Sequence, residues 1–150
     1  MITYGNGFRE SGIDPRRSVA WWNSNEPGKF RNNMVAQPAF VDEGGRDFHL
    51  KAGSPMIDAG TFLTQTASAG SGTTLPVKDA AYFYDGFGIP GEQGDEIQLE
   101  GNSATAIVVA VDYANNTLTL DRSLSWSSGQ GVSLKYNGNA PDIGAFESEG

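Results

Sequence analysis

Short runs of alternating apolar and polar residues fill the middle of the chain. In one of them Ile97 and Leu99 fall on the same face, which is the spacing of a half-buried β-strand. In another, Ile107-Val108-Val109 forms a β-branched run long enough for a fully buried strand. Such segments predict a set of short strands with tight turns. The strand-like segments are residues 75–84, 95–100, 104–111, 117–120 and 131–136.

The turn signals between these segments indicate how they are arranged. Asn115-Asn116 separates two apolar-patterned runs, and asparagine tolerates the positive φ that hairpin turns require, so we expect a β-hairpin there. Several short strands in under 80 residues favour a small antiparallel β-barrel or sandwich, because closure removes exposed sheet edges. We predict that this unit occupies residues 61–138.

The flanking residues have a different texture. Residues 1–60 are irregular and rich in turns, as at Glu26-Pro27-Gly28 and Glu43-Gly44-Gly45, and residues 139–150 form a brief closing segment. Long Ala/Leu/Glu/Lys-rich stretches with helical spacing are missing from the sequence. The chain is therefore predicted to be all-β.

Composition narrows the classes of partner. The 150 residues carry 10 Lys and Arg against 18 Asp and Glu, a formal net charge of -8. Nucleic acid is not expected as a partner, because phosphate backbones bind clustered basic residues and only Arg16-Arg17 forms such a pair. The absence of cysteine excludes disulfides and thiolate metal sites. Neither a signal peptide nor a run of about 18 apolar residues is present, so we expect no membrane span and a soluble chain.

Two separated stretches resemble the C-terminal motif of right-handed parallel β-helix proteins of the pectate-lyase-like superfamily. The first runs from Gln37-Pro38-Ala39-Phe40-Val41-Asp42 through Asp47-Phe48-His49-Leu50 to Gly53-Ser54-Pro55-Met56-Ile57-Asp58-Ala59-Gly60. The second is Ala140-Pro141-Asp142-Ile143-Gly144-Ala145-Phe146-Glu147.

The resemblance implies that residues 1–60 and 139–150 form a terminal β-helix-like coil and its closing strand, with residues 61–138 inserted between them. It also implies an extracellular or cell-surface location, as part of a longer, secreted bacterial parent. The open end of such a coil would allow homo-oligomer formation.

The motif itself has a packing role. Asp58 and Asp142 are short carboxylates suited to accepting hydrogen bonds from turn amides, while Gly60 and Gly144 permit approaches that a Cβ would block. His49, the single histidine, is expected at a strand position rather than in a catalytic triad. The residues expected in the core of the coil are Phe40, Val41, Phe48, Leu50, Met56, Ile57, Ile143 and Phe146.

An acidic, glycine-rich stretch spans residues 85–96. Asp85, Asp95 and Glu96 supply the hard oxygen atoms that Ca²⁺ prefers, so calcium is a candidate ligand. Their spacing is not that of an EF-hand, and ordinary turn chemistry is the alternative.

Aromatic residues form the second candidate site. Sugar rings stack on exposed aromatic faces, so Trp and Tyr side chains on a β scaffold are typical of a carbohydrate-binding surface; the alternative is that they build the core. If their segment is extended, Trp21 and Trp22 cannot both point inward. Trp126, in a polar stretch, is expected to be exposed. The candidate residues are Trp21, Trp22, Tyr82, Tyr84, Phe87 and Trp126.

Three functions are compatible with these observations. The first is a non-catalytic accessory or capping module that binds polysaccharide. The second is a structural cap or assembly domain without a ligand. The third is a small polysaccharide lyase or glycoside hydrolase, although the resemblance implies that catalytic groups sit on middle coils that this chain lacks, and no catalytic residue is assigned.

Overall fold

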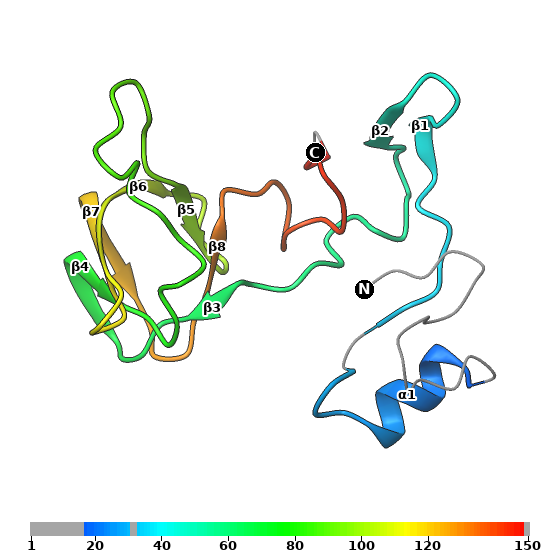
Figure 1. Cartoon of the computed structure of the whole chain (residues 1–150), viewed down its shortest axis with the longest axis horizontal. Helices are drawn as coiled ribbons and strands as arrows, with labels where there is room; N and C mark the ends of the chain where they lie inside the picture. The colour runs from blue at the N-terminus through cyan, green and yellow to red at the C-terminus, as the bar shows by residue number, and fades with distance from the viewer. Residues whose placement is uncertain (1–16, 31–32, 149–150) are drawn as a thin grey trace.

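The computed structural model describes residues 17–30 and 33–148 and divides them into two parts (Figure 1). A curled six-stranded sheet lies at one end, and a two-stranded hairpin and one short helix lie at the other. Residues 51–63 and 135–148 run between them. The elements are α1 (Val19–Asn25), β1 (Phe40–Asp42), β2 (Asp47–Leu50), β3 (Thr64–Gln65), β4 (Gly70–Pro76), β5 (Glu96–Leu99), β6 (Thr105–Asp112), β7 (Thr117–Trp126) and β8 (Gly131–Leu134).

The larger sheet has the order β3-β8-β5-β6-β7-β4, and every neighbouring pair is antiparallel. Its two edges approach each other just beyond β3 and β4, where Thr66 and Val77 form an antiparallel bridge. The amide of Ala67 donates to the carbonyl of Pro76 at 2.9 Å, and the amide of Lys78 donates to the carbonyl of Gln65 at 2.8 Å. The sheet is therefore barrel-like, which confirms an all-β chain, and it is called the barrel below.

The core of the barrel forms because period-two strands turn one face inward. Leu118, Leu120, Leu124 and Trp126 of β7 all lie on that face, and Leu75 of β4 is fully buried. Each aliphatic side chain that leaves water in this way contributes about 1.5–3 kcal/mol. The other fully buried aliphatic side chains of the cluster are Ala80, Ile97, Leu99, Ala106, Val108 and Val132.

The predicted strands agree with the structure except at the first. Residues 95–100, 104–111 and 131–136 contain β5, most of β6 and β8, and the 117–120 segment extends to Trp126. Asn116 has φ 50° in the turn between β6 and β7, as its residue type indicated. Strand β4 ends at Pro76, however, so the aromatic residues 82–84 lie in a loop rather than in a strand.

The parallel coil predicted for the N-terminal part is not formed among the described residues. Strands β1 and β2 instead pair antiparallel as a hairpin. Its turn is stabilised by Asp42, whose Oδ1 accepts a hydrogen bond from the amide of Gly45 at 3.0 Å. In a parallel β-helix each strand hydrogen-bonds to the equivalent strand of a second coil. In the described part of the chain, β2 instead folds back beside β1. Leu50 and Met56 are buried as expected, but Val41, Phe48 and Phe146 are 46%, 42% and 45% exposed.

The two halves of the family-like motif nevertheless meet. The amide of Gly60 donates to the carbonyl of Pro141 at 2.7 Å, and a Cβ on Gly60 would lie 2.5 Å from that same oxygen. The amide of Asp58 donates to Asp142 Oδ1 at 2.8 Å. At Gly144 an added Cβ would lie no closer than 3.7 Å to its nearest neighbour, the carbonyl oxygen of Phe146, so there is room for a side chain there.

Asp58 completes this junction from the other side. Its carboxylate accepts hydrogen bonds from the amides of Asn139 at 2.7 Å and Ala140 at 3.1 Å, which lie 81 and 82 positions further along the chain. These donors, Ala140 first, hold the pKa of Asp58 below its ordinary value. The chain therefore enters and leaves the barrel at one point.

Helix α1 was not predicted. Ser18 caps it by accepting a hydrogen bond from the amide of Trp21 at 3.1 Å, and Trp22 packs against Phe30 with ring centroids 5.3 Å apart. Because Trp21 and Trp22 lie on a helix, the alternation of side chains expected of an extended segment does not apply to them.

Candidate functional site

The most exposed aromatic residues of the barrel lie on the loop that precedes β5. Residues 82–94, called the aromatic loop below, project from one end of the barrel (Figure 1). Tyr82 is 54% exposed and Phe87 is 66% exposed, while Tyr84 is half-buried. The rings of Tyr84 and Phe87 are tilted by 30° with centroids 5.8 Å apart. Three of the six predicted aromatic residues are therefore gathered on one loop.

Hydrogen bonds to aspartate side chains fix the shape of this loop. Asp85 Oδ1 accepts from the amide of Phe87 at 3.0 Å, and its Oδ2 accepts from the amide of Val111 on β6 at 3.1 Å. Asp95 Oδ2 accepts from the amide of Tyr84 at 3.0 Å. The base of the loop packs so closely on β6 that a Cβ on Gly94 would lie 1.9 Å from the carbonyl oxygen of Val108. The aromatic loop is thus braced by contacts to the barrel.

Phe87 adopts an unusual backbone conformation within this frame. Its φ is 49°, in the left-handed region that costs an L residue about 1–2 kcal/mol. Gly86 and Gly88 on either side also have positive φ, at 83° and 67°. Glycine adopts this left-handed region without steric cost, whereas the Cβ of Phe87 makes it unfavourable. The loop therefore holds a large apolar ring toward solvent on a strained backbone.

The remaining predicted aromatic residues do not belong to this surface. Trp126 is only 8% exposed and sits in the barrel core, where its ring lies over Gly70 with Cζ2 3.1 Å from the Cβ position of that residue. The expectation that Trp126 is exposed is therefore wrong, because it ends the inward-facing series Leu118, Leu120, Leu124 of β7. Its Nε1 has no hydrogen-bond partner among residues 17–30 and 33–148.

Trp21 and Trp22 lie far from the aromatic loop, on helix α1 at the other end of the molecule (Figure 1). Trp22 is buried, and Trp21 contacts it edge to face with centroids 4.9 Å apart. The guanidinium carbon of Arg17 lies 4.6 Å from the centre of the Trp21 ring. Both tryptophans therefore pack locally around the helix and do not extend the loop surface.

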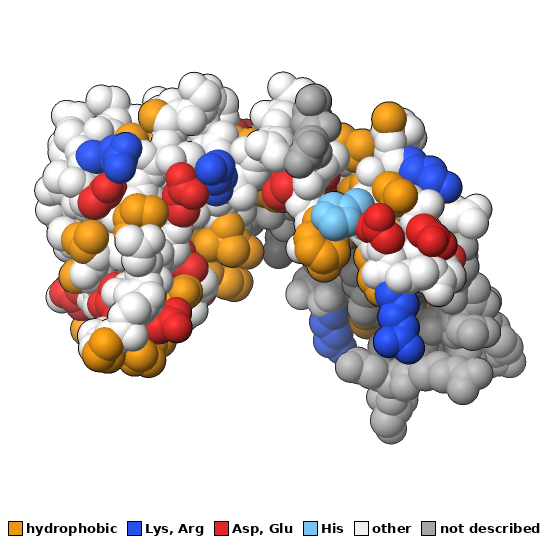
Figure 2. Space-filling model, turned by 90° about the horizontal axis from the view of Figure 1, so that it is seen from above, with side chains coloured by type: hydrophobic (Ala, Val, Ile, Leu, Met, Phe, Trp, Pro, Cys, Tyr) orange, Lys and Arg blue, Asp and Glu red, His pale blue; other side chains and the backbone are white. Residues whose placement is uncertain are grey.

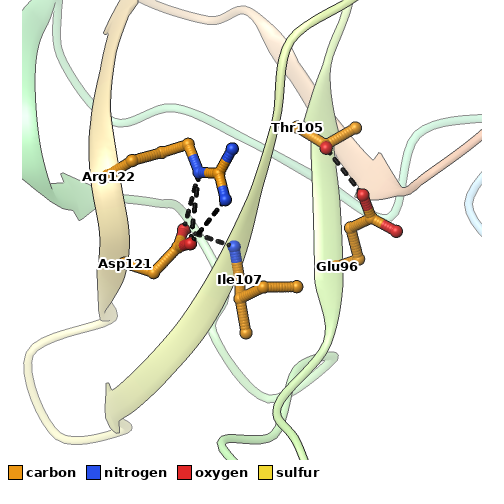
Figure 3. A network of polar contacts seen from close by, with 5 residues as sticks. All are labelled: Glu96, Thr105, Ile107, Asp121 and Arg122. Atoms are coloured by element: carbon orange, nitrogen blue, oxygen red, sulfur yellow. Dashed lines mark hydrogen bonds and ion pairs between the residues drawn. The ribbon is translucent and has the colours of Figure 1, made fainter.

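The three carboxylates considered as calcium ligands have separate roles. Asp85 and Asp95 accept backbone amides as described, and burial raises the pKa of Asp95. Glu96 Oε1 accepts from the hydroxyl of Thr105 at 2.6 Å (Figure 3), and its Oε2 lies 3.4 Å from Lys135 Nζ. The Thr105 hydrogen bond, more than Lys135, lowers the pKa of Glu96. Among the described residues, no three His, Asp or Glu side chains are grouped as metal ligands.

Strands β6 and β7 carry a further polar contact beside Glu96. Asp121 Oδ1 accepts from the amide of Ile107 at 2.8 Å, and its Oδ2 pairs with Arg122 Nη2 at 2.8 Å (Figure 3). The bond to Ile107 lies next to a register shift between β6 and β7, so the carboxylate satisfies an amide where the ladder is irregular. This cluster stabilises the sheet.

His49 lies on the hairpin, as expected for a strand residue. Its Nδ1 is 2.6 Å from Asp47 Oδ1, and its ring stacks on Phe146 with centroids 4.1 Å apart. This contact links the hairpin to the C-terminal segment.

Sequence reasoning missed two exposed side chains near the aromatic loop. Ile89 is 54% exposed within the loop itself, and its position before Pro90 in a turn was the available signal. Tyr113 is 47% exposed and its hydroxyl donates to the carbonyl of Phe83 at 2.9 Å, which attaches the β6–β7 turn to the start of the loop. That contact had no sequence signal.

Comparison with known proteins identifies no relative. No family model, no curated protein and no solved structure matches this chain. Among the described residues, no helix has the length and apolar character required to cross a membrane.

Proposed function

We propose that this chain is a non-catalytic accessory module that binds carbohydrate through the aromatic loop. The observation that carries the proposal is Phe87, whose exposed ring stands beside Tyr84 on a backbone of positive φ. Neither the exposure of that ring nor the strained backbone contributes to folding. Strain that persists in a braced loop is a reason to look for function.

The geometry suits a sugar ligand for a physical reason. Sugar rings present apolar C–H faces that stack on aromatic rings, and Tyr adds a hydroxyl at the edge for hydrogen bonding. Asp85 and Asp95 already fix the backbone of Phe87 and Tyr84, so the loop loses little backbone entropy when a ligand binds. Tyr82, Tyr84 and Phe87 are therefore the proposed contact residues.

The wider context is also a proposal and rests on the sequence resemblance. We propose that the module belongs to a larger secreted, extracellular or cell-surface bacterial protein of β-helix type. The meeting of the two motif halves at Asp58 and Asp142 supports this placement, since the barrel would then be inserted at one point of the parent scaffold.

The test is binding to a glycan array followed by affinity electrophoresis with the positive glycans. Wild type is compared with Phe87→Ala and with a matched control, Phe48→Ala, which removes another exposed Phe from β2. We expect Phe87→Ala to weaken binding about tenfold, the value of one ring contact of about 1.4 kcal/mol, and Phe48→Ala to bind like wild type. Absence of binding across the array, or equal binding by Phe87→Ala, would overturn the proposal.

A structural cap or assembly domain is the second candidate, and a different observation favours it. Val41, Phe48 and Phe146 expose apolar surface around the hairpin, on the opposite part of the molecule from the aromatic loop. Apolar patches of this kind are typical of association surfaces. Light scattering after size exclusion tests it: a dimer that Phe48→Glu converts to a monomer supports assembly through the hairpin, and a wild-type monomer at high concentration contradicts it.

A further inference from the structure

Residues 79–121, the segment that includes the aromatic loop, account for the whole formal net negative charge of the protein. Residues 79–121 contain eight of the 18 acidic residues and no Lys or Arg. The rest of the chain therefore holds ten acidic and ten basic residues and is formally neutral. Figure 2 shows acidic and apolar side chains interspersed over the visible face of the barrel. The eight are Asp79, Asp85, Glu92, Asp95, Glu96, Glu100, Asp112 and Asp121.

The nearby basic side chains do not neutralise the loop. Arg122 pairs with Asp121, and Lys135 lies beside Glu96, both on the strands of the barrel. Lys78 Nζ donates to Gln65 Oε1 at 2.5 Å, beside the bridge that joins the sheet edges. The described basic groups of the barrel are thus engaged outside the aromatic loop.

Two carboxylates remain on the aromatic loop, those of Asp85 and Glu92. Asp85 accepts hydrogen bonds from the backbone amides of Phe87 and Val111, and no described basic side chain pairs with it. Glu92 lies across the loop, where its carbonyl oxygen is 3.0 Å from the Cβ position of Gly86. The carboxylate of Glu92 is exposed and has no partner among the described residues. Aromatic faces and carboxylates together attract ammonium groups, through cation–π and Coulomb interactions.

We infer that the aromatic loop selects an amine-bearing, cationic polysaccharide over neutral or acidic ones, with Phe87 and Tyr84 stacking on the sugar and Asp85 and Glu92 facing its ammonium groups. The inference rests on the proposed carbohydrate-binding function and specifies its ligand class. An acidic polysaccharide is disfavoured, because its carboxylates would approach Asp85 and Glu92, which no described basic side chain neutralises.

Two oligosaccharides with the same backbone isolate the charge. Isothermal titration at pH 5.5 compares the β-1,4-linked hexamer of glucosamine, whose amines are protonated, with the hexamer of N-acetylglucosamine, which is neutral. We expect the wild type to bind the glucosamine hexamer about tenfold more tightly at low salt. Because exposed charges are screened at high ionic strength, the difference should largely vanish in 0.5 M NaCl.

Variants locate the effect on the loop. We expect Glu92→Gln to reduce the preference for the glucosamine hexamer two- to threefold while leaving binding of the acetylated hexamer unchanged. Glu43→Gln removes another exposed carboxylate, from the β1–β2 turn, and should change the affinity for neither hexamer. Phe87→Ala should weaken binding of both hexamers.

The outcomes separate this inference from the function on which it rests. Equal affinity for the two hexamers at low salt, with loss of both in Phe87→Ala, overturns the charge selection but leaves carbohydrate binding intact. A Glu43→Gln effect as large as that of Glu92→Gln overturns it as well, because the attraction would then be general. If neither hexamer binds and the glycan array is also negative, both the inference and the proposed function fail.

Discussion

The strained backbone of Phe87 makes a prediction that is independent of any ligand. Substitution by Ala and by Gly removes the same ring, so the difference in stability between the two variants reports the backbone alone. At φ 49°, Ala carries the left-handed penalty of about 1–2 kcal/mol that Gly avoids. Glycine, however, loses more conformational freedom than Ala on folding, which lowers the free energy of unfolding of the Gly variant by roughly 0.5–1 kcal/mol.

The net expectation is that Phe87→Gly is more stable than Phe87→Ala by about 0.5–1 kcal/mol. For a chain of 150 residues this corresponds to a difference in Tm of roughly 1–4 °C. Urea denaturation followed by circular dichroism measures the difference in the free energy of unfolding directly, and the slope of the transition shows whether both variants unfold in the same way.

Tyr82 provides the matched control. It is exposed on the same loop but is not among the residues with positive φ. There Gly should be less stable than Ala by about 0.4–1 kcal/mol, so the order of the two variants reverses between positions 82 and 87. If Phe87→Gly proves less stable than Phe87→Ala, the backbone of Phe87 is not strained in solution and the main support for a functional loop is lost.

Three further predictions concern the core, the junction and the acidic residues. Trp126→Ala should lower the free energy of unfolding by about 3–5 kcal/mol in urea denaturation, whereas Trp126→Phe, which also removes the unpaired Nε1–H, should lie within about 1.5 kcal/mol of wild type. The pKa of Asp58 is lowered in the folded state, so its stabilising effect is present above the unfolded pKa and is lost as the pH falls through the folded pKa. Below about pH 4 the free energy of unfolding should therefore fall less steeply with pH in Asp58→Asn than in wild type. Since Asp85, Asp95 and Glu96 are engaged separately, Tm should be the same in millimolar CaCl₂ and in EDTA, and a rise in Tm with calcium would contradict their assigned roles.

The strands of the barrel were predictable because their signal is local. Period-two alternation at Ile97 and Leu99, and again at Leu118 and Leu120, depends only on which face of a strand meets the core. The same rule, continued through Leu124 and Ser125, would have placed Trp126 inside. The polar residues that follow Trp126 obscured a pattern that was present in the sequence.

The sequence indicated that Asp58 and Asp142 accept hydrogen bonds from amides, as they do, but the partners of the acidic residues were not predictable because they lie at distant positions. Asp85 bonds the amide of Val111, 26 residues away, and Asp58 bonds that of Asn139, 81 residues away. Helix α1 could not be predicted from the sequence for a different reason. It has only seven residues and is stabilised by the Ser18 cap and by the Trp22–Phe30 contact rather than by helix propensity.

The clamp between Asp58 and the residues around Pro141 has a consequence for how the protein can be rebuilt. Because the strands that begin and end the barrel, β3 and β8, are also neighbours in the sheet, its two connections to the rest of the chain run side by side. The barrel can therefore be shortened or exchanged for another barrel without changing the distance between the two segments that join it to the rest of the chain. For the same reason its two ends can be linked to give a circular permutant. If the aromatic loop binds carbohydrate as proposed, its specificity can be changed by exchanging the barrel while the residues on either side of it stay the same.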